Sequence, residues 1–159
     1  MLSVENLKSE INKIWPKHGP SESQVIKYLK KYKNEKIIIK CGGSVLLDPN
    51  LFNLFIQDIV VMKKLGLTPI IVHGGGPRIK KKLNELNIKS TFIKGLRVTD
   101  EKIIKIVEDV LIKFNGEIIK ALKDLSCEAR PITTRENNII LVEPEKKELG
   151  FVGIPNEIK

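Results

Sequence analysis

The segment that most constrains this fold is VHGGGPRI, residues 72–79, where three consecutive glycines lie between an apolar run and a helical pattern. The apolar run 68–72 predicts a strand, and Pro77 suits the first helical position because a missing N–H costs little there. Glycines let the backbone approach a phosphate or carboxylate, and the free N–H groups of the helix point at such an anion. The segment therefore predicts either an anion site or a tight strand-to-helix turn.

A second strand and glycine pair come earlier in the chain. KIIIK (36–40) is β-branched and predicts a fully buried strand, which Gly42 and Gly43 follow. Residues 50–65 have apolar positions at helical spacing, and Gly66 is a natural stop. Two strands separated by a helix form a βαβ unit with a parallel sheet, and ligands of such sheets bind beyond the carboxyl ends of the strands.

Lys40 stands directly before the first glycine pair. A lysine there could act as a point charge on a phosphoryl group held by the second glycine segment, or it could be a strand-end lysine that points to water. Neither glycine segment continues into the Gly-Lys-Ser/Thr of a Walker loop, and there is no GxGxxG. A dinucleotide-binding Rossmann domain is therefore not favoured.

The rest of the chain is predicted to contain further helices, a hairpin and strands. Apolar spacing predicts three further helices before residue 87, over 3–15, 22–32 and 77–86. A long helix is expected over 100–125, with Thr99 as its cap. Residues 90–98 indicate a hairpin interrupted by Gly95. The strand candidates are 127–133 and 138–143, joined by a polar turn at 135–137, and a strand that starts within 150–158.

Charge and composition narrow the classes of partner. The net charge is +9, with 28 Lys and Arg against 19 Asp and Glu, and few aromatic residues interleave with the lysines. This pattern favours a solvated lysine-rich surface over a nucleic-acid interface, and a basic field suits small anionic substrates. No apolar run approaches the roughly 18 residues that span a bilayer, and no signal peptide is visible at the N-terminus. We expect no membrane association and a cytoplasmic location.

The cysteines and histidines indicate no metal site. Cys41 and Cys127 are far apart, so neither a disulfide nor a zinc framework is indicated. His18 and His73 are too few for a histidine-based site.

Three blocks together, KCGGS (40–44), IVHGGGPRI (71–79) and STFIKGLRVTD (90–100), resemble the N-acetylglutamate kinases of the amino acid kinase family. The third block is the most discriminating, and the similarity runs in collinear order from about residue 24 to residue 159, including the late GFVG (150–153). The resemblance implies an α/β fold, a three-layer αβα sandwich with a mainly parallel sheet. It also implies phosphoryl transfer from ATP with Mg²⁺ to the γ-carboxylate of N-acetyl-L-glutamate, the second step of arginine synthesis.

The resemblance assigns roles to seven residues. Lys40 would stabilise charge on the transferring phosphoryl group, and Arg97 would hold the α-carboxylate of the amino acid as a guanidinium fork. The backbone N–H groups of Gly75 and Gly76 would bind the substrate. The phosphates would lie against Gly42, Gly43 and Gly74.

Family members are nearly twice as long as this chain. The resemblance therefore implies that residues 22–159 are the N-terminal, N-acetylglutamate-binding lobe, that residues 1–21 are an N-terminal helical extension, and that the C-terminal ATP-binding lobe is absent. The chain alone is then expected to be inactive or nearly so. A homodimer or hexamer and an arginine effector are further expectations. PITTRENN (131–138) departs from the usual glycine- and serine-containing loop. A non-catalytic amino-acid-binding half-protein and a related kinase acting on acetylaminoadipate stay open as alternatives.

Overall fold

The computed structural model describes residues 19–32, 35–43, 47–133 and 139–158. Its helices are α2 (Glu22–Lys31), α3 (Pro49–Lys64), α4 (Gly76–Glu85), α5 (Glu101–Asp124) and the short 3₁₀ turn η2 (Lys147–Leu149). Its strands are β1 (Lys36–Cys41), β2 (Thr68–His73), β3 (Phe92–Ile93), β4 (Leu96–Arg97), β5 (Ile140–Pro144) and β6 (Gly153–Ile158). The predicted helix over 3–15 lies outside the described residues.

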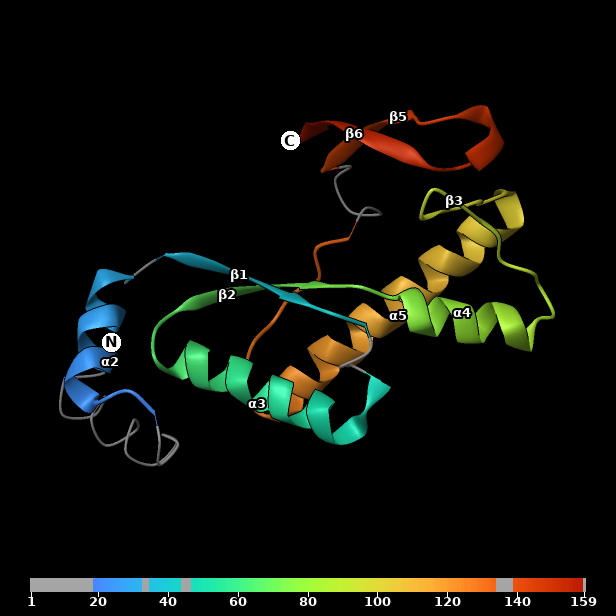
Figure 1. Ribbon diagram of the computed structural model, residues 1–159. Coiled ribbons are helices and arrows are strands. Elements are labelled where there is room, and N and C mark those ends of the chain that lie inside the picture. Colours follow the sequence, from blue (N-terminus) through green and yellow to red (C-terminus); the bar gives the residue numbers. More distant parts are fainter. Residues whose placement is uncertain (1–18, 33–34, 44–46, 134–138, 159) are drawn as a thin grey trace.

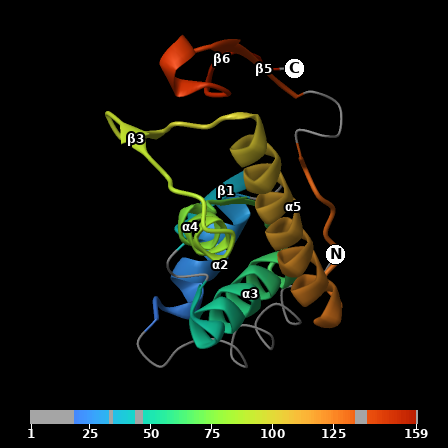
Figure 2. The same ribbon diagram turned by 90° about the vertical axis from the view of Figure 1, so that its right-hand side faces the viewer.

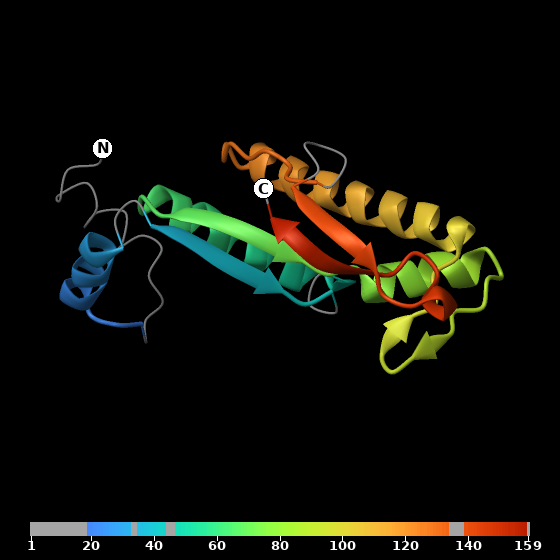
Figure 3. The same cartoon turned by 90° about the horizontal axis from the view of Figure 1, so that it is seen from above.

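The central unit is the parallel pair of β1 and β2, joined through α3. The register runs from Lys36 opposite Thr68 to Cys41 opposite His73, so both strands end at the same edge. Seen from above, the two strands run side by side over α3 (Figure 3). This arrangement confirms the predicted βαβ unit and the α/β class. Two antiparallel pairs, β3 with β4 and β5 with β6, accompany it.

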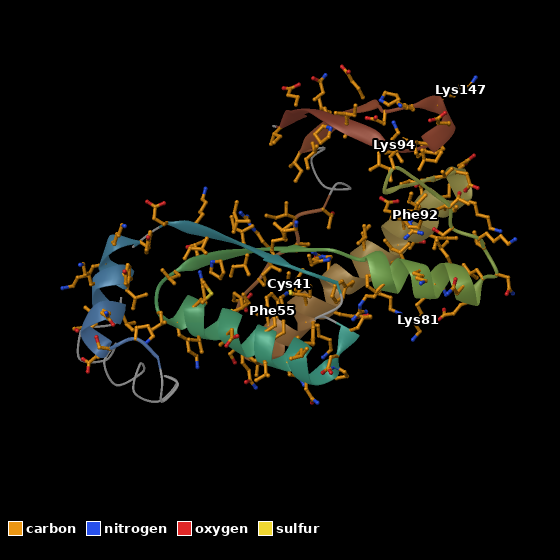
Figure 4. All side chains as sticks on the ribbon, viewed as in Figure 1. Cys41, Phe55, Lys81, Phe92, Lys94 and Lys147 are labelled. Atoms are coloured by element: carbon orange, nitrogen blue, oxygen red, sulfur yellow. The ribbon has the colours of Figure 1, made fainter. Side chains whose placement is uncertain are left out.

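Helices α3 and α5 cover one face of this sheet (Figure 1). Ile39 and Ile71 point to that face and pack against a buried cluster from the end of β1, from both helices and from the residue stretch after α5: Cys41, Ile56, Ile59, Val60, Phe114, Ile118, Leu122 and Cys127. Figure 4 places Cys41 and Phe55 between the sheet and α3. A second cluster of Ile79, Leu83 and Ile103 joins α4 to α5, which lie side by side when the view is turned (Figure 2).

The prediction that β1 is fully buried is wrong in the described structure. Side chains alternate across a strand, so Ile38 points away from the helices and is 72% exposed, while Val72, opposite Lys40 on the same face, is 47% exposed. Full burial needs a layer on each face, and among the described residues helices pack on one face of this pair. No helix in the described ranges combines the length and apolarity needed to cross a bilayer.

Helix starts follow the expected chemistry with one exception. Asp48 caps α3 by accepting hydrogen bonds from the N–H groups of Asn50 and Leu51, and Ser21 forms a capping box with Gln24 at the start of α2. The prediction that Thr99 caps the long helix is wrong. Asp100 is the cap, since its Oδ1 accepts from the N–H of Ile103 at 2.7 Å.

The predicted strand over 127–133 is also wrong, because those residues have no strand structure. The turn proposed at 135–137 lies outside the described residues. The strand expected over 138–143 is confirmed as β5, and the last strand is confirmed as β6, which pairs antiparallel with β5. An isolated strand cannot satisfy its backbone groups, so pairing with β6 rather than with 127–133 decides which segment becomes a strand.

Candidate functional site

The two glycine segments meet at the carboxyl ends of β1 and β2. The N–H of Gly74 donates to the carbonyl of Cys41 at 3.3 Å, and a Cβ on Gly43 would lie 3.0 Å from Cδ of Pro77 and 3.5 Å from the carbonyl oxygen of Gly74. A side chain at Gly43 would therefore fill the space between the two segments. The structure thus brings together the glycines that the sequence assigns to one edge of the sheet.

The second segment leads directly into α4. Gly75 is the N-cap with no side-chain hydrogen bond, Gly76 is the first helical residue and Pro77 follows it, one position later than the sequence predicts. The first N–H groups of a helix have no partner within it and carry the positive end of its dipole. The start of α4 therefore offers backbone donors to an anion.

Gly75 is buried because α5 crosses directly behind it. A Cβ at this position would lie 2.4 Å from Cδ2 of Leu111, whereas a Cβ on Gly76 meets nothing within 4 Å. A side chain at Gly75 would thus have to displace the end of the Leu111 side chain, whereas one at Gly76 would displace nothing.

This difference gives a prediction with a built-in control. Gly75→Ala should lower the free energy of unfolding by about 1–3 kcal/mol, because Leu111 must move from a packed position. Gly76→Ala should be neutral or stabilising by up to about 1 kcal/mol. Urea denaturation of the two variants measures both effects. Equal stabilities would contradict the close contact, and Leu111→Ala should relieve part of the loss in the Gly75 variant.

Lys40 lies in β1, opposite Val72, with an exposed side chain on the same face as Ile38. This is the face that helices α3 and α5 leave open. Neighbouring Cys41 points the other way into the core, where burial raises the pKa of its thiol above the usual range. Cys41 therefore packs as a neutral group, while Lys40 presents its charge at the open face next to the first glycine pair.

Arg97 lies in β4, on the hairpin that the sequence predicted around Gly95. Its guanidinium hydrogen-bonds Ser90 through Nη1 and stacks over the ring of Phe92, with Cζ 4.6 Å from the ring centroid. Phe92 and Lys94 lie on this hairpin, between α4 and the β5–β6 hairpin (Figure 4). Arg97 is thus held by its own hairpin, whereas the two glycine segments are held by each other.

A polar cluster that the sequence did not predict lies next to the glycine segment. Asn115 Nδ2 lies 3.3 Å from Nε2 of His73. The rings of His73 and Phe114 pack edge-on, with their centroids 4.9 Å apart. The guanidinium of Arg78 lies over the same Phe114 ring, with Cζ 3.8 Å from its centroid, and pairs with Glu117 at 2.7 Å. These residues tie the end of β2 and the start of α4 to the middle of α5.

This environment shifts the titration of His73. Burial is the largest cause and lowers its pKa below 6.5, the charge of Arg78 lowers it further, and a hydrogen bond to the backbone of Gly74 opposes both. The folded chain therefore binds fewer protons at this site than the unfolded chain as pH falls below 6.5.

Stability should consequently fall as pH drops from about 7.5 toward 5.5, because protonating His73 favours the unfolded state. The variant His73→Gln has no titrating ring and should lose less stability over the same interval. Urea denaturation at the two pH values, with Lys113→Gln as a surface control, measures the difference. An identical fall in the wild type and in His73→Gln would contradict the lowered pKa.

Comparison with known proteins places the chain in a family. The model of the amino acid kinase family matches residues 35–150, which include both glycine segments and the Arg97 hairpin. The chain belongs to the amino acid kinase family. This membership confirms the fold expected from the three sequence blocks.

Similar family members share a name. An acetylglutamate kinase from Pelagibacter ubique is 63% identical over 151 residues, covering 95% of this chain and 52% of that protein. One from Petrotoga mobilis is 40% identical, covering 96% of this chain and 50% of that protein. The chain thus spans about half the length of the curated relatives that it matches.

Solved structures agree on the fold. The structure of smu.665 from Streptococcus mutans has a TM-score of 0.66 at 25% identity, over 78% of this chain and 51% of that one. N-acetylglutamate synthase from Neisseria gonorrhoeae, complexed with coenzyme A and L-arginine, has a TM-score of 0.62 at 16% identity, over 86% of this chain and 34% of that one. The second likeness concerns the fold alone.

Proposed function

We propose that this chain supplies the amino-acid site and part of the phosphoryl site of a kinase that transfers phosphate from ATP to the γ-carboxylate of N-acetyl-L-glutamate. The similarity to acetylglutamate kinases over 95% of the chain supports the reaction class. The observation that carries the proposal is the contact between the two glycine segments at the start of α4. Such a surface of backbone donors suits an anion whose charge is spread over several oxygens.

The proposal gives each group a task. Lys40 attracts the transferring phosphoryl group as a point charge. Gly42, Gly43 and Gly74 lie against the phosphates, because glycines let the backbone approach such an anion closely. The N–H groups of Gly75 and Gly76 bind the substrate and the phosphoryl group that is transferred. Arg97 holds the α-carboxylate bidentately.

The described residues suit the phosphates of ATP better than they suit Mg²⁺. ATP supplies the phosphoryl group, and the glycine surface suits its phosphates. Magnesium prefers carboxylate and other oxygen ligands, and the described residues contain no group of three or more His, Cys, Asp or Glu side chains that could hold a metal ion. The residues described here therefore fit the phosphates and do not by themselves form a metal site.

Calorimetric titration of the chain tests the substrate. N-acetylglutamate should bind saturably, and N-acetyl-2-aminoadipate, with one more methylene, should bind about tenfold more weakly because a pocket shaped for the shorter chain resists the longer one. Glutamate without the acetyl group is the control for non-specific attraction to a basic surface. Equal or tighter binding of the longer acid would move the assignment to that substrate, and no binding of any of them would overturn the proposal.

A further inference from the structure

Thr99 is a buried polar residue between the Arg97 hairpin and α5, and it is 5% exposed. Its Oγ1 donates to the carbonyl of Arg97 at 2.9 Å, although the sequence predicts this side chain as a helix cap. Its N–H donates to the carbonyl of Leu149, and its carbonyl accepts from the N–H of Phe151, at 2.9 and 2.7 Å. Thr99 therefore links the backbone of Arg97 to a segment about fifty residues later.

This link requires glycine at residue 150. Gly150 has a φ of 68°, and a Cβ there would lie 2.2 Å from the carbonyl oxygen of Thr99. That oxygen belongs to the backbone and cannot rotate away as a flexible side chain could. Leu149, next to it, is only 2% exposed, so its burial also holds this segment in place. The approach of the two backbones thus depends on Gly150.

Arg97 is held at both of its ends by these contacts. Its guanidinium is oriented by Ser90 and by the ring of Phe92, while its carbonyl is fixed by Thr99. Next to it, the N–H of Val98 donates to the carbonyl of Thr91 at 2.9 Å and closes the hairpin. A side chain anchored at its tip but loose at its backbone could tilt with the hairpin, so the anchor at Thr99 sets where the guanidinium is presented.

We propose that Thr99 and Gly150 are positioning residues that fix Arg97 for carboxylate binding through the link between β4 and the β5–β6 hairpin. This inference rests on the proposed function for the identity of the ligand. It rests on the hydrogen bonds of Thr99 and the close approach of Gly150 for the position of Arg97. The β5–β6 hairpin would then contribute to substrate affinity through Arg97.

Thr99→Val and Thr99→Ser form the test pair, since valine keeps the volume and loses the hydroxyl while serine keeps the hydroxyl. In the ligand-free chain, the NMR signal of the Arg97 Nε–H, assigned with Arg97→Lys, should shift and broaden in the valine variant and return in the serine variant. The dissociation constant for N-acetylglutamate should rise about fivefold with valine and stay within about twofold with serine, since one neutral hydrogen bond is lost. Gly150→Ala should act in the same direction, and if it fails to fold, the Thr99 pair decides.

The NMR signal of Arg97 tests whether Thr99 positions this side chain, and the affinity for N-acetylglutamate tests the identity of the ligand. An unchanged Arg97 signal in Thr99→Val overturns the positioning inference whether or not the ligand binds. A displaced signal with unchanged affinity also overturns it. A displaced signal in a chain whose wild type does not bind N-acetylglutamate overturns the proposed function and supports Arg97 positioning alone.

Discussion

Arg97→Ala is expected to weaken binding of N-acetylglutamate roughly 10- to 100-fold, since hydrogen bonds to a charged group each contribute about 1.5–3 kcal/mol. In the structure this guanidinium is oriented by contacts within its own hairpin, with Ser90 and with the ring of Phe92. A preoriented group loses less side-chain freedom on binding, which is why its removal should cost more than removal of a mobile surface arginine. Titration calorimetry measures the change.

Two variants control this prediction. Arg130 lies in an exposed position after α5, so Arg130→Ala removes the same charge from the chain and should leave the affinity within about twofold of the wild type, because exposed and distant charges are screened. Arg97→Lys keeps the charge but loses the fork and should bind with intermediate affinity. Equal losses in the Arg97 and Arg130 variants would show that the basic surface as a whole, and not Arg97, attracts the ligand.

Phe114→Ala is expected to lower the free energy of unfolding by about 3–5 kcal/mol, the range for aromatic residues removed from a core. Phe114 is 1% exposed and contacts both the ring of His73 and the guanidinium of Arg78. Its removal leaves a cavity against the end of β2 and also takes away the ring that both polar groups pack on. Chemical denaturation at neutral pH measures the loss.

Phe151 supplies the matched control. It is 60% exposed, so Phe151→Ala should cost less than about 1 kcal/mol by the area of apolar surface that it buries. A small effect of Phe114→Ala, comparable to that of Phe151→Ala, would contradict the packing of α5 behind the glycine segment.

The sequence predicted the elements that depend on local pattern. The apolar runs at 36–40 and 68–72, each followed by glycines, predicted two parallel strands that end in glycine segments, and this prediction is confirmed. Gly95 indicated the hairpin turn, where it has a φ of 83° that glycine adopts readily. These features were predictable because strand period, turn chemistry and the geometry of a parallel sheet operate over short stretches of chain.

The sequence-based predictions were wrong where a contact with another part of the chain decides the local structure. Thr99 and Asp100 are both good caps, and only the hydrogen bond from Thr99 to the carbonyl of Arg97 shows why Asp100 takes that role. The segment 127–133 resembles a strand in composition, yet β6 pairs with β5 instead.

The contact between His73 and Asn115 was not predictable either. It joins residues 42 positions apart with no spacing signal in the sequence. Pairing of distant segments is set by tertiary packing, which a local pattern does not encode.

The most direct test of the central claim is an NMR titration of the wild-type chain with N-acetylglutamate. If the start of α4 and the Arg97 hairpin form the amino-acid site, the amide signals of Gly74, Gly75 and Gly76 and the Nε–H of Arg97 should shift together along one saturable curve. The amide signals of α2, at the other end of the chain's described fold, should stay in place (Figure 1). Shifts confined to surface lysines, or no shift at the glycine segment at saturating ligand, would contradict the account.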